Sequence, residues 1–287
     1  MCAHVPDIWL LDNGSPVDRL AEIASLFPDV RIVAMRENLG WAGAYNRGIA
    51  LAAEEGADAV YILNNDAILR EGALELALET LRTGSNIAAV GSVMLFHGGA
   101  RVFFDGEWHW GDGIAIEDVP SGVRDVRSIH GGGFALSIAA FRAVGAFEPA
   151  YFLYHEEADW CLRARAAGWR IVMDGRSRVD HEGEGSNTGF NSSYYRARNR
   201  FLARRRGIAL RDRPESALSI VEYEYLEAAG RPIAARVAIT NGLIDGLRGR
   251  FGQRQGRTVP VITVPLAIVL PILFRLRRKL ATALTRR

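Results

Sequence analysis

Short apolar runs alternate with helical patterns through the first hundred residues, and this alternation restricts the fold more than any other feature. The runs at 8–11, 31–34, 59–63 and 87–96 indicate buried strands. Helical stretches separate them, of which the small-residue segment 40–55 is one. Strands that alternate with helices predict a mostly parallel sheet covered on both faces. Ligands of such sheets bind beyond the carboxyl ends of the strands.

Polar residues follow two of these strands directly. Asp12-Asn13-Gly14-Ser15 comes after the first run, and Asn64-Asn65-Asp66 comes after the third. A carboxylate at a strand end can accept hydrogen bonds from a base or ribose, as we expect of Asp12. It can also hold Mg²⁺ or Mn²⁺ against a diphosphate, as we expect of Asp66. Helix capping and turn geometry, without any ligand, are the alternatives.

Glycines gather at two further places. The segment 38–48 begins a helix, where glycines permit close backbone approach and free amides suit a phosphate. Tight packing of that helix on the sheet explains the same residues equally well. Gly131-Gly132-Gly133 precedes a hydrophobic segment, so its backbone can touch a ligand; a flexible connector is the alternative.

Three carboxylates fall within four residues of the segment 151–160, which also carries four aromatic rings. A helix that begins near Glu156 places Glu156 and Asp159 on one face and turns Glu157 elsewhere. The helix N-terminus favours ionised carboxylates, and an ionised carboxylate that reaches a hydroxyl is a general base. A solvated first turn is the alternative, but the aromatic rings favour a partly buried platform that suits sugar rings.

Composition excludes several classes of protein. The chain has 287 residues, of which 49% are hydrophobic and 24% charged, enough for one large core and an appendage. Cys2 and Cys161 fit no metal or redox spacing and indicate a reducing, cytosolic setting. No signal peptide is expected at the start. The basic-aromatic run 194–200 lacks any zinc-finger, RNA-recognition or helix-turn-helix signature, so no nucleic-acid partner is expected.

The composition changes after residue 190. We expect a catalytic domain over 1–190, a helical basic extension over 191–257, and an apolar and basic tail over 258–287. The apolar run 259–274 contains three prolines, and it is shorter than the roughly 20 apolar residues of a membrane-spanning helix. Apolar residues followed by arginines fit docking on an anionic membrane surface. Packing on the catalytic domain or on a partner subunit is the alternative, and a homo-oligomer is left open.

Six motifs, taken in order, resemble those of the family 2 glycosyltransferases, especially the bacterial rhamnosyltransferase-like branch. The resemblance covers roughly residues 7 to 200. The matching segments are Leu11-Asp12-Asn13-Gly14-Ser15, Asn38-Leu39-Gly40-Trp41 with Asn46-Arg47-Gly48, Leu63-Asn64-Asn65-Asp66, the stretch from Gly145 to Asp159, His181 with Ser186, and Tyr194 to Asn199.

The resemblance implies a GT-A fold, which is a Rossmann-like α/β sheet, and an inverting transfer of a sugar from a nucleotide diphosphate with Mg²⁺ or Mn²⁺. It implies Asp66 and His181 as metal ligands and Glu157 as the catalytic base, with Glu156 and Asp159 beside it. The implied nucleotide-sugar contacts are Asp12, Asn13, Ser15, Asn38, Gly40, Asn46 and Asn65. The acceptor site is assigned to Gly132, Gly133 and Trp160.

Two departures from the family pattern bear on activity. The pattern starts one strand earlier, so the strand that carries part of the nucleotide pocket is expected to be absent. Glu157 also stands where the family has Asp, and its side chain is one methylene longer. A non-catalytic or weakly active nucleotide-sugar-binding protein therefore remains an alternative, as does a sugar nucleotidyltransferase.

The expected product is a bacterial cell-surface or capsular polysaccharide. The expected acceptor is a glycan or a lipid-linked glycan, which the enzyme would meet in the cytoplasm or at the inner face of the membrane.

Overall fold

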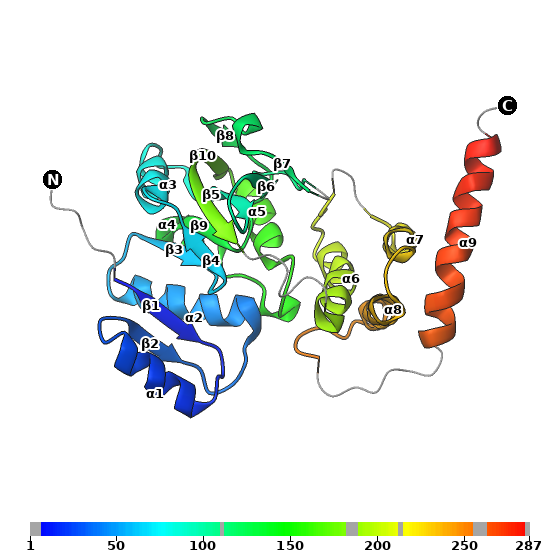
Figure 1. Ribbon diagram of the computed structural model, residues 1–287, viewed down its shortest axis with the longest axis horizontal. Coiled ribbons are helices and arrows are strands. Elements are labelled where there is room, and N and C mark those ends of the chain that lie inside the picture. Colours follow the sequence, from blue (N-terminus) through cyan, green and yellow to red (C-terminus); the bar gives the residue numbers. More distant parts are fainter. Residues whose placement is uncertain (1–6, 110–111, 182–188, 212–214, 255–262, 285–287) are drawn as a thin grey trace.

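The computed structural model describes residues 7–109, 112–181, 189–211, 215–254 and 263–284 (Figure 1). Within them the chain forms a small sheet, a large sheet with helices against it, and a group of helices that lies to one side. The large sheet and the helices on it contain most of the buried hydrophobic residues.

The small sheet has two parallel strands. Its elements are β1 (Trp9–Asp12), α1 (Val17–Leu26) and β2 (Arg31–Ala34), and α2 (Gly40–Glu54) follows. These elements agree with the apolar runs of the sequence. Gly48 of α2 lies so close to Leu11 that a Cβ there would meet the Leu11 Cδ1 at 2.6 Å. The glycines of α2 therefore serve helix packing at this point, one of the two explanations that the sequence left open.

The large sheet has eight strands, with the central order β3-β9-β5-β10-β4. Its strands are β3 (Ala59–Leu63), β4 (Ala67–Leu69), β5 (Ile87–Phe96), β6 (Arg101–Phe104), β7 (Ile114–Ala115), β8 (Val123–Asp125), β9 (Gly133–Ser137) and β10 (Arg170–His181). The helices of this part are α3 (Ala73–Arg82), α4 (Ile138–Val144) and α5 (Glu156–Ala166), with single 3₁₀ turns η1 (Ile116–Asp118) and η2 (Pro149–Tyr151).

The α/β fold with helices against a central sheet is confirmed, but the sheet is mixed where a mostly parallel one was expected. Among the described strands of the large sheet, β5 and β10 form the single parallel pair, and β9 runs antiparallel between β3 and β5. The alternation of strand and helix stops after β5, because the chain reaches β9 through short strands and loops. β3 and β5 both oppose β9, so their carboxyl ends reach the same edge of the sheet.

The two sheets are not joined by a strand. In the described ranges, β1 pairs with β2 alone and β3 pairs with β9 alone, so each keeps one edge without a strand partner. α2 contacts both β1 and β3 and thereby connects the two sheets.

Four helices form the C-terminal part: α6 (Phe190–Arg205), α7 (Ala217–Ala228), α8 (Ile233–Arg248) and α9 (Thr263–Leu284). They share a core of their own that includes Phe201, Tyr225 and Leu243. The apolar run that the sequence suggested was short and broken lies in one continuous helix, α9, with Pro271 inside it. Pro265 is tolerated because it falls in the first turn, where backbone N–H groups have no intrahelical partner. No described helix combines the length and hydrophobicity needed to cross a membrane.

Candidate active site

Asp66 and His181 lie together at one edge of the large sheet. Asp66 follows β3 and leads into β4, whose Ala67 is paired with His181 at the end of β10. This pairing brings Oδ1 of Asp66 to 3.3 Å from Nε2 of His181, and Nδ2 of Asn64 lies 3.4 Å from the same nitrogen. The His181 side chain is only 6% exposed, whereas that of Asp66 is 30% exposed. The carboxylate can therefore be reached by a ligand.

A carboxylate oxygen and an imidazole nitrogen at one point suit a divalent cation. In the described part of the chain, no group of three His, Cys, Asp or Glu side chains could hold a metal. Mg²⁺ in proteins often takes further ligands from phosphates and water. Ser186, which belongs to the His181 motif, lies outside the described residues.

The carboxylates at the start of α5 differ in environment. Glu156 is 2% exposed, and its Oε2 has no hydrogen-bond partner among the described residues. Burial and the neighbouring Glu157 raise the pKa of Glu156 well above its usual range. Burial also raises the pKa of Glu157 to about 7, although backbone N–H groups and Arg196 oppose the shift. The expectation that the helix N-terminus keeps these groups ionised is corrected, because desolvation outweighs it.

Glu157 fits the part of general base better than Glu156. It is only half-buried, and a pKa near 7 lets it accept a proton at neutral pH. Glu156 is buried, and burial disfavours its ionised form.

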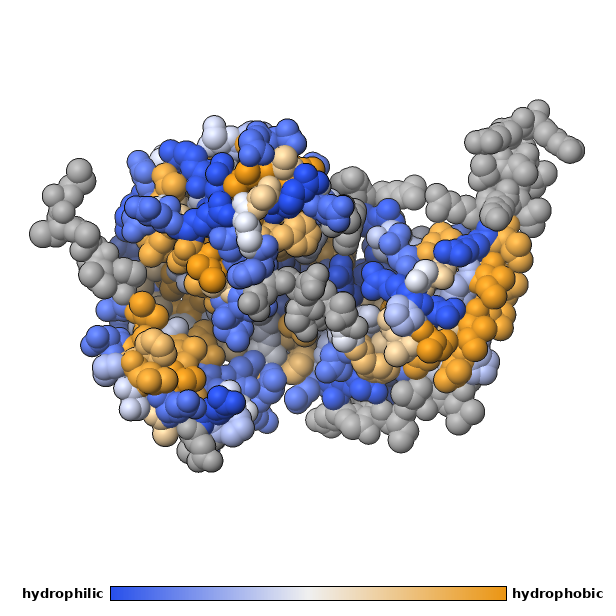
Figure 2. Space-filling view, in the orientation of Figure 1, coloured by the Kyte–Doolittle hydropathy of each residue, from blue (hydrophilic) through white to orange (hydrophobic). Residues whose placement is uncertain are grey.

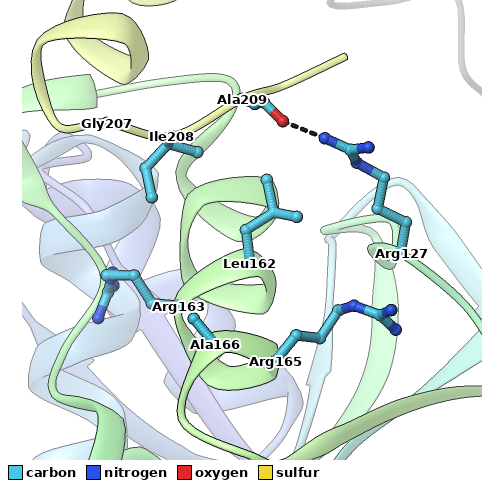
Figure 3. Close-up of a pocket in the computed structure, with 8 residues that line it drawn as sticks. All are labelled: Arg127, Leu162, Arg163, Arg165, Ala166, Gly207, Ile208 and Ala209. Carbon is cyan, nitrogen blue, oxygen red and sulfur yellow. Dashed lines mark hydrogen bonds between the residues drawn. The ribbon is translucent and has the colours of Figure 1, made fainter. Parts of the chain in front are cut away.

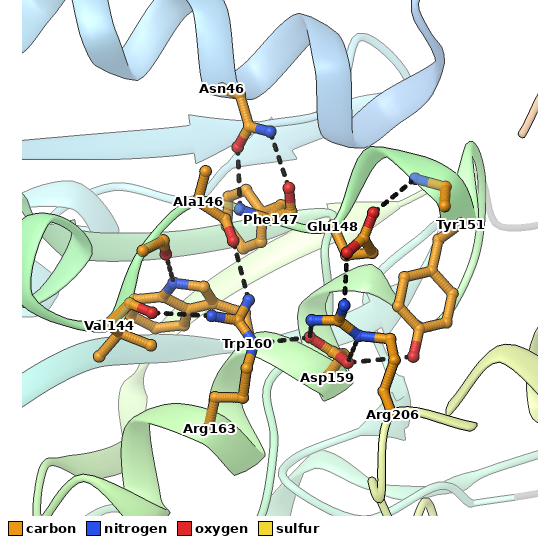
Figure 4. A network of polar contacts seen from close by, with 12 residues as sticks. Asn46, Val144, Ala146, Phe147, Glu148, Tyr151, Asp159, Trp160, Arg163 and Arg206 are labelled. Atoms are coloured by element: carbon orange, nitrogen blue, oxygen red, sulfur yellow. Dashed lines mark hydrogen bonds and ion pairs between the residues drawn. The ribbon is translucent and has the colours of Figure 1, made fainter. Parts of the chain in front are cut away.

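Asp159 and Trp160 lie in the protein interior. Both are fully buried, and Figure 4 shows Arg163 and Arg206 converging on the Asp159 carboxylate. The Arg163 Nε and Arg206 Nε donate to it at 2.8 and 2.9 Å, and Tyr151 Oη donates at 3.1 Å. The Trp160 Nε1 donates to the Gly145 carbonyl. This burial contradicts direct acceptor contact by Trp160, and it gives Asp159 a structural role.

The loop before α5 has a strained backbone. Phe152, Tyr154 and His155 have φ angles of 64°, 70° and 76°, a region that non-glycine residues rarely adopt. Asn199 of α6 holds the loop by donating to the carbonyls of Tyr151, Leu153 and Tyr154. The fully buried Arg-Asn pair of the Tyr194–Asn199 motif thus clamps the segment that places Glu157.

Most residues predicted to hold the nucleotide lie around the start of α2. The Asp12 Oδ1 accepts from the Ser15 N–H at 3.1 Å, while its buried Oδ2 has no partner in the described part of the chain. Asn13 accepts from the Leu39 N–H and donates to the Gly40 carbonyl and to Asn38 Oδ1. The orphaned Oδ2 of Asp12 is a candidate acceptor for a base or ribose.

The other predicted nucleotide contacts are placed differently. Asn46 exchanges two hydrogen bonds with the backbone of Phe147, so it fastens α2 to the segment before α5. Gly40 has a φ of 72°, and a Cβ there would meet the Phe152 carbonyl oxygen at 2.2 Å. Asn65 and Ser15 are exposed. Gly40 is therefore explained by packing, and Asn65 remains available beside Asp66.

The glycines predicted to contact the acceptor are packed against side chains. A Cβ on Gly132 would lie 2.9 Å from both His130 Nδ1 and His181 Cδ2, and one on Gly133 would meet Val179 at 3.0 Å. Gly132 and Gly133 are buried, so they allow the His130 and His181 rings to approach each other. A ligand contact by either residue remains a prediction.

Sequence reasoning missed His130 and Trp108. They lie near Asp66 and His181, the two candidate metal ligands, which are called the metal pair below. The rings of His130 and His181 are 5.5 Å apart, and the ring of Trp108 lies 5.3 Å from that of His130. Burial and the nearby His181 and Arg196 lower the pKa of His130 to about 3, so this ring is neutral. The position of His130 just before the three glycines was an available signal, but Trp108 lies in a segment without periodicity.

A pocket of about 510 Å³ lies between α5 and residues 207–209 (Figure 3). Its arginines are engaged by the protein: Arg163 binds Asp159, Arg165 donates to the Val126 carbonyl, and Arg127 donates to the Ala209 carbonyl. None of the predicted site residues lines this pocket. The end of the large sheet at Asp66 and His181 remains the candidate functional site.

Residues 5–162 match the model of Glycosyl transferase family 2, and the chain belongs to that family.

Two characterised relatives are each 26% identical to this chain. One is an N-acetylglucosaminyl-diphospho-decaprenol L-rhamnosyltransferase of Mycobacterium tuberculosis, matched over 201 residues that cover 61% of this chain and 66% of the relative. The other is the low-salt glycan biosynthesis hexosyltransferase Agl10 of Haloferax volcanii, for which the shares are 69% and 67%. The chain thus spans 66% of the length of the first relative.

Among solved structures, the chain is similar to the mannosyltransferase PcManGT from Pyrobaculum calidifontis in complex with GDP-Man and Mn²⁺. That likeness has a TM-score of 0.49 and 16% identity, and it covers 94% of this chain and 72% of that one. The chain is also similar to GalNAc-T7 with UDP, GalNAc and Mn²⁺, at a TM-score of 0.47 and 15% identity, covering 61% and 37%.

Proposed function

We propose that this protein is an inverting, metal-dependent glycosyltransferase that moves a sugar from a nucleotide diphosphate to a hydroxyl acceptor. The observation that carries the proposal is the partly exposed Asp66 carboxylate next to His181, together with Glu157 of α5, a half-buried glutamate with a pKa of about 7. Membership of Glycosyl transferase family 2 supports the same reaction.

A short series of contacts connects Glu157 to the metal pair. Cys161 lies one helical turn after Glu157, and its thiol is hydrogen-bonded to the backbone of Ile129. Ile129 precedes His130, whose ring contacts that of His181. The charge of Arg196 lowers the pKa of both Glu157 and His130, so this guanidinium lies near both. The base candidate and the metal candidate therefore share one region of the molecule.

The residues at the sheet edge fit Mg²⁺ or Mn²⁺. Asp66 is partly exposed and supplies a carboxylate oxygen, and the nitrogen of His181 faces that oxygen. Such a cation would neutralise charge on the departing diphosphate. Arg196 is placed to add a second positive charge on the side of Glu157.

The proton of the acceptor hydroxyl passes to Glu157 in this scheme. The acceptor oxygen forms a bond to the anomeric carbon while the bond from that carbon to the diphosphate oxygen breaks. A single displacement inverts the configuration of the sugar. In this scheme the nucleotide part of the donor binds Asp12, whose Oδ2 has no hydrogen-bond partner among the described residues, and the exposed amide of Asn65.

The test is release of nucleoside diphosphate from a panel of UDP-, GDP- and dTDP-sugars, with and without Mn²⁺ and an acceptor. We expect release that depends on metal and is lost in Glu157→Gln, while that variant still binds donor. Glu156→Gln is the matched control and should retain activity. If Glu156→Gln is inactive and Glu157→Gln active, the base is Glu156. Release of pyrophosphate from a nucleoside triphosphate and a sugar phosphate would instead establish a nucleotidyltransferase.

The surface of α9 favours a lipid-linked glycan at the inner face of the membrane as the acceptor. Figure 2 shows an apolar stripe along α9, formed by exposed residues that include Ile268, Ile272 and Leu276. The opposite face packs Ala267 and Phe274 on α7 and α8. Exposed arginines follow the stripe. An apolar stripe that ends in positive charge fits an anionic lipid surface.

Vesicle flotation tests this part of the proposal. The protein should float with vesicles that contain phosphatidylglycerol and remain below with neutral vesicles, and Ile268→Asp with Ile272→Asp should abolish flotation. Deletion of 258–287 should do the same. Equal flotation of the altered protein would make α9 a packing element. Loss of a dimer in the same variant, with no flotation of the unaltered protein, would assign the stripe to a second copy of the chain.

A further inference from the structure

The segment from β6 to β7 carries an aromatic cluster up to the metal pair. Trp108 contacts Phe104 and His130, with ring centroids 5.2 and 5.3 Å apart. Phe103 lies behind them, 5.4 Å from His130 and 6.0 Å from His181. The segment from β6 to β7 lies outside the six motifs found in the sequence. The proposed reaction uses none of its residues.

The outer member of the cluster differs from the two inner phenylalanines in exposure. Phe103 and Phe104 are 7% and 2% exposed, as core residues are, whereas Trp108 is 43% exposed. A large aromatic ring that stays in solvent beside buried rings is held in place by packing and still presents surface to a ligand. Pockets for small molecules combine such rings with a few placed polar groups.

His130 supplies a polar group of defined donor character. Its Nδ1 accepts a hydrogen bond from the Gly132 N–H at 3.0 Å, so the proton of the neutral ring is on Nε2. Nε2 has no hydrogen bond among the described residues and is not among the buried polar atoms without a partner. The ring therefore carries an N–H donor without a described partner, and it lies against the rings of Trp108 and His181.

We propose that Trp108 and His130 form the subsite for the hexose ring of the donor, with Trp108 as an aromatic platform for its apolar face and His130 Nε2–H as a donor to one of its hydroxyls. The inference rests on the proposed function, because the diphosphate at Asp66 and His181 brings the sugar to this place. His130 connects this subsite to both parts of the proposed site, because its ring contacts that of His181 and it follows Ile129, whose backbone is hydrogen-bonded to Cys161 of α5.

The experiment separates the sugar from the nucleotide. Calorimetry with Mn²⁺ gives the affinity of the protein for UDP, GDP and dTDP and for their hexose conjugates. For the best donor, the ratio of the two affinities measures what the sugar contributes. We expect Trp108→Ala to lower this ratio by about fivefold to tenfold, the size of one aromatic contact. The affinity for the nucleoside diphosphate without the sugar should change by less than about twofold, within the usual effect of a surface substitution.

Matched variants guard against loss of structure. Trp108→Phe retains a platform and should keep most of the ratio. His130→Asn keeps an acceptor for the Gly132 N–H, but its shorter amide leaves no donor at the position of Nε2, so it should lower the ratio as His130→Ala does. Phe27→Ala removes an aromatic ring that is 56% exposed elsewhere and should change nothing. Thermal melting of each variant confirms that it is folded.

The outcomes distinguish the two proposals. Unchanged ratios in both Trp108→Ala and His130→Asn, with metal-dependent nucleotide binding intact, would overturn the subsite and leave the proposed function standing. If the ratio falls in only one of the two variants, that residue belongs to the subsite and the other does not. No binding of any nucleotide or nucleotide sugar by the unaltered protein would overturn both the proposed function and the subsite.

Discussion

The two sheets of this protein carry different parts of the proposed site, and their strands differ in how deeply they are buried. β5 is buried from Ile87 to Leu95, and β10 is buried over most of its length. In β1 and β2, by contrast, only Asp12 is buried. The eight-stranded sheet carries the metal pair and lies next to α5, while the two-stranded sheet carries the candidate nucleotide contacts.

This contrast indicates that chemistry and nucleotide recognition rest on parts of different stability. A two-stranded sheet on its own is marginal in water and depends on its packing partners. Here that partner is α2, which reaches both sheets. A ligand that binds only the ordered form stabilises it by mass action. We therefore expect the nucleotide end to become ordered by its ligand and the metal end to be ordered beforehand.

Removal of the carboxylate at the ordered end should have the largest effect. Asp66→Ala is expected to lower turnover by about a thousandfold, a loss of the size seen when charge stabilisation of a leaving group is removed. The side chain is 30% exposed, so the melting temperature should hardly move. Steady-state rates over a Mn²⁺ titration measure the effect, with Glu71→Ala, at an exposed position outside the proposed site, as the control. Unchanged turnover would remove Asp66 from the metal role.

Matched leucine truncations compare the stability of the two sheets. Leu95→Ala in β5 deletes a fully buried side chain and should cost about 3 kcal/mol of unfolding free energy. Leu11→Ala in β1 deletes a half-buried one and should cost about 1 kcal/mol, since the site can relax. Chemical denaturation followed by circular dichroism measures both. Equal costs would show that the small sheet is as firmly packed as the large one.

The pH dependence tests the environment of α5. Because Glu157 must be ionised to accept a proton and its pKa is about 7, kcat/KM should fall about tenfold per pH unit below 7. Glu157→Gln should abolish this dependence together with the activity. A profile that is flat down to pH 5 would exclude Glu157 as the base.

Stability should show the linked effect with the opposite sign. Carboxyl groups whose pKa is raised on folding take up protons as the chain folds, so stability is full below pH 4.5 and falls as the pH rises towards 7. The slope is at most about 1.4 kcal/mol per pH unit for each group. Thermal melting from pH 4.5 to 8 should show the decline, and Glu156→Gln should reduce it. An unchanged slope in that variant would mean that Glu156 is ionised in the folded protein.

Hydrogen exchange gives the smallest effect and tests the comparison most directly. Amides of β1 and β2 should exchange faster than those of β5 and β10, because local opening is easier where few apolar contacts close the structure. Addition of a nucleoside diphosphate with Mn²⁺ should slow exchange in β1 and leave β5 unchanged. Mass spectrometry of peptides that cover residues 9–12 and 87–96 measures both rates. Equal protection without ligand would contradict the contrast between the sheets.

Several features of the fold could be predicted from the sequence because they depend on local pattern. The strands at 31–34, 59–63 and 87–96 have the bounds that their apolar runs predicted. The helix that begins at Glu156 was also placed correctly. Strand pairing could not be predicted, because the direction of β9 depends on how the chain crosses the molecule between 97 and 132.

The candidate site divides in the same way. The sequence by itself determined that carboxylates and amides follow β1 and β3 and begin α5, since these positions depend on which residue ends an apolar run. Only the tertiary structure decided which of them meet. It brought Asp66 to His181 and Trp108 to His130, and it enclosed Asp159 between two guanidiniums. Burial and proximity across distant segments arise from packing, and no local pattern in the chain encodes them.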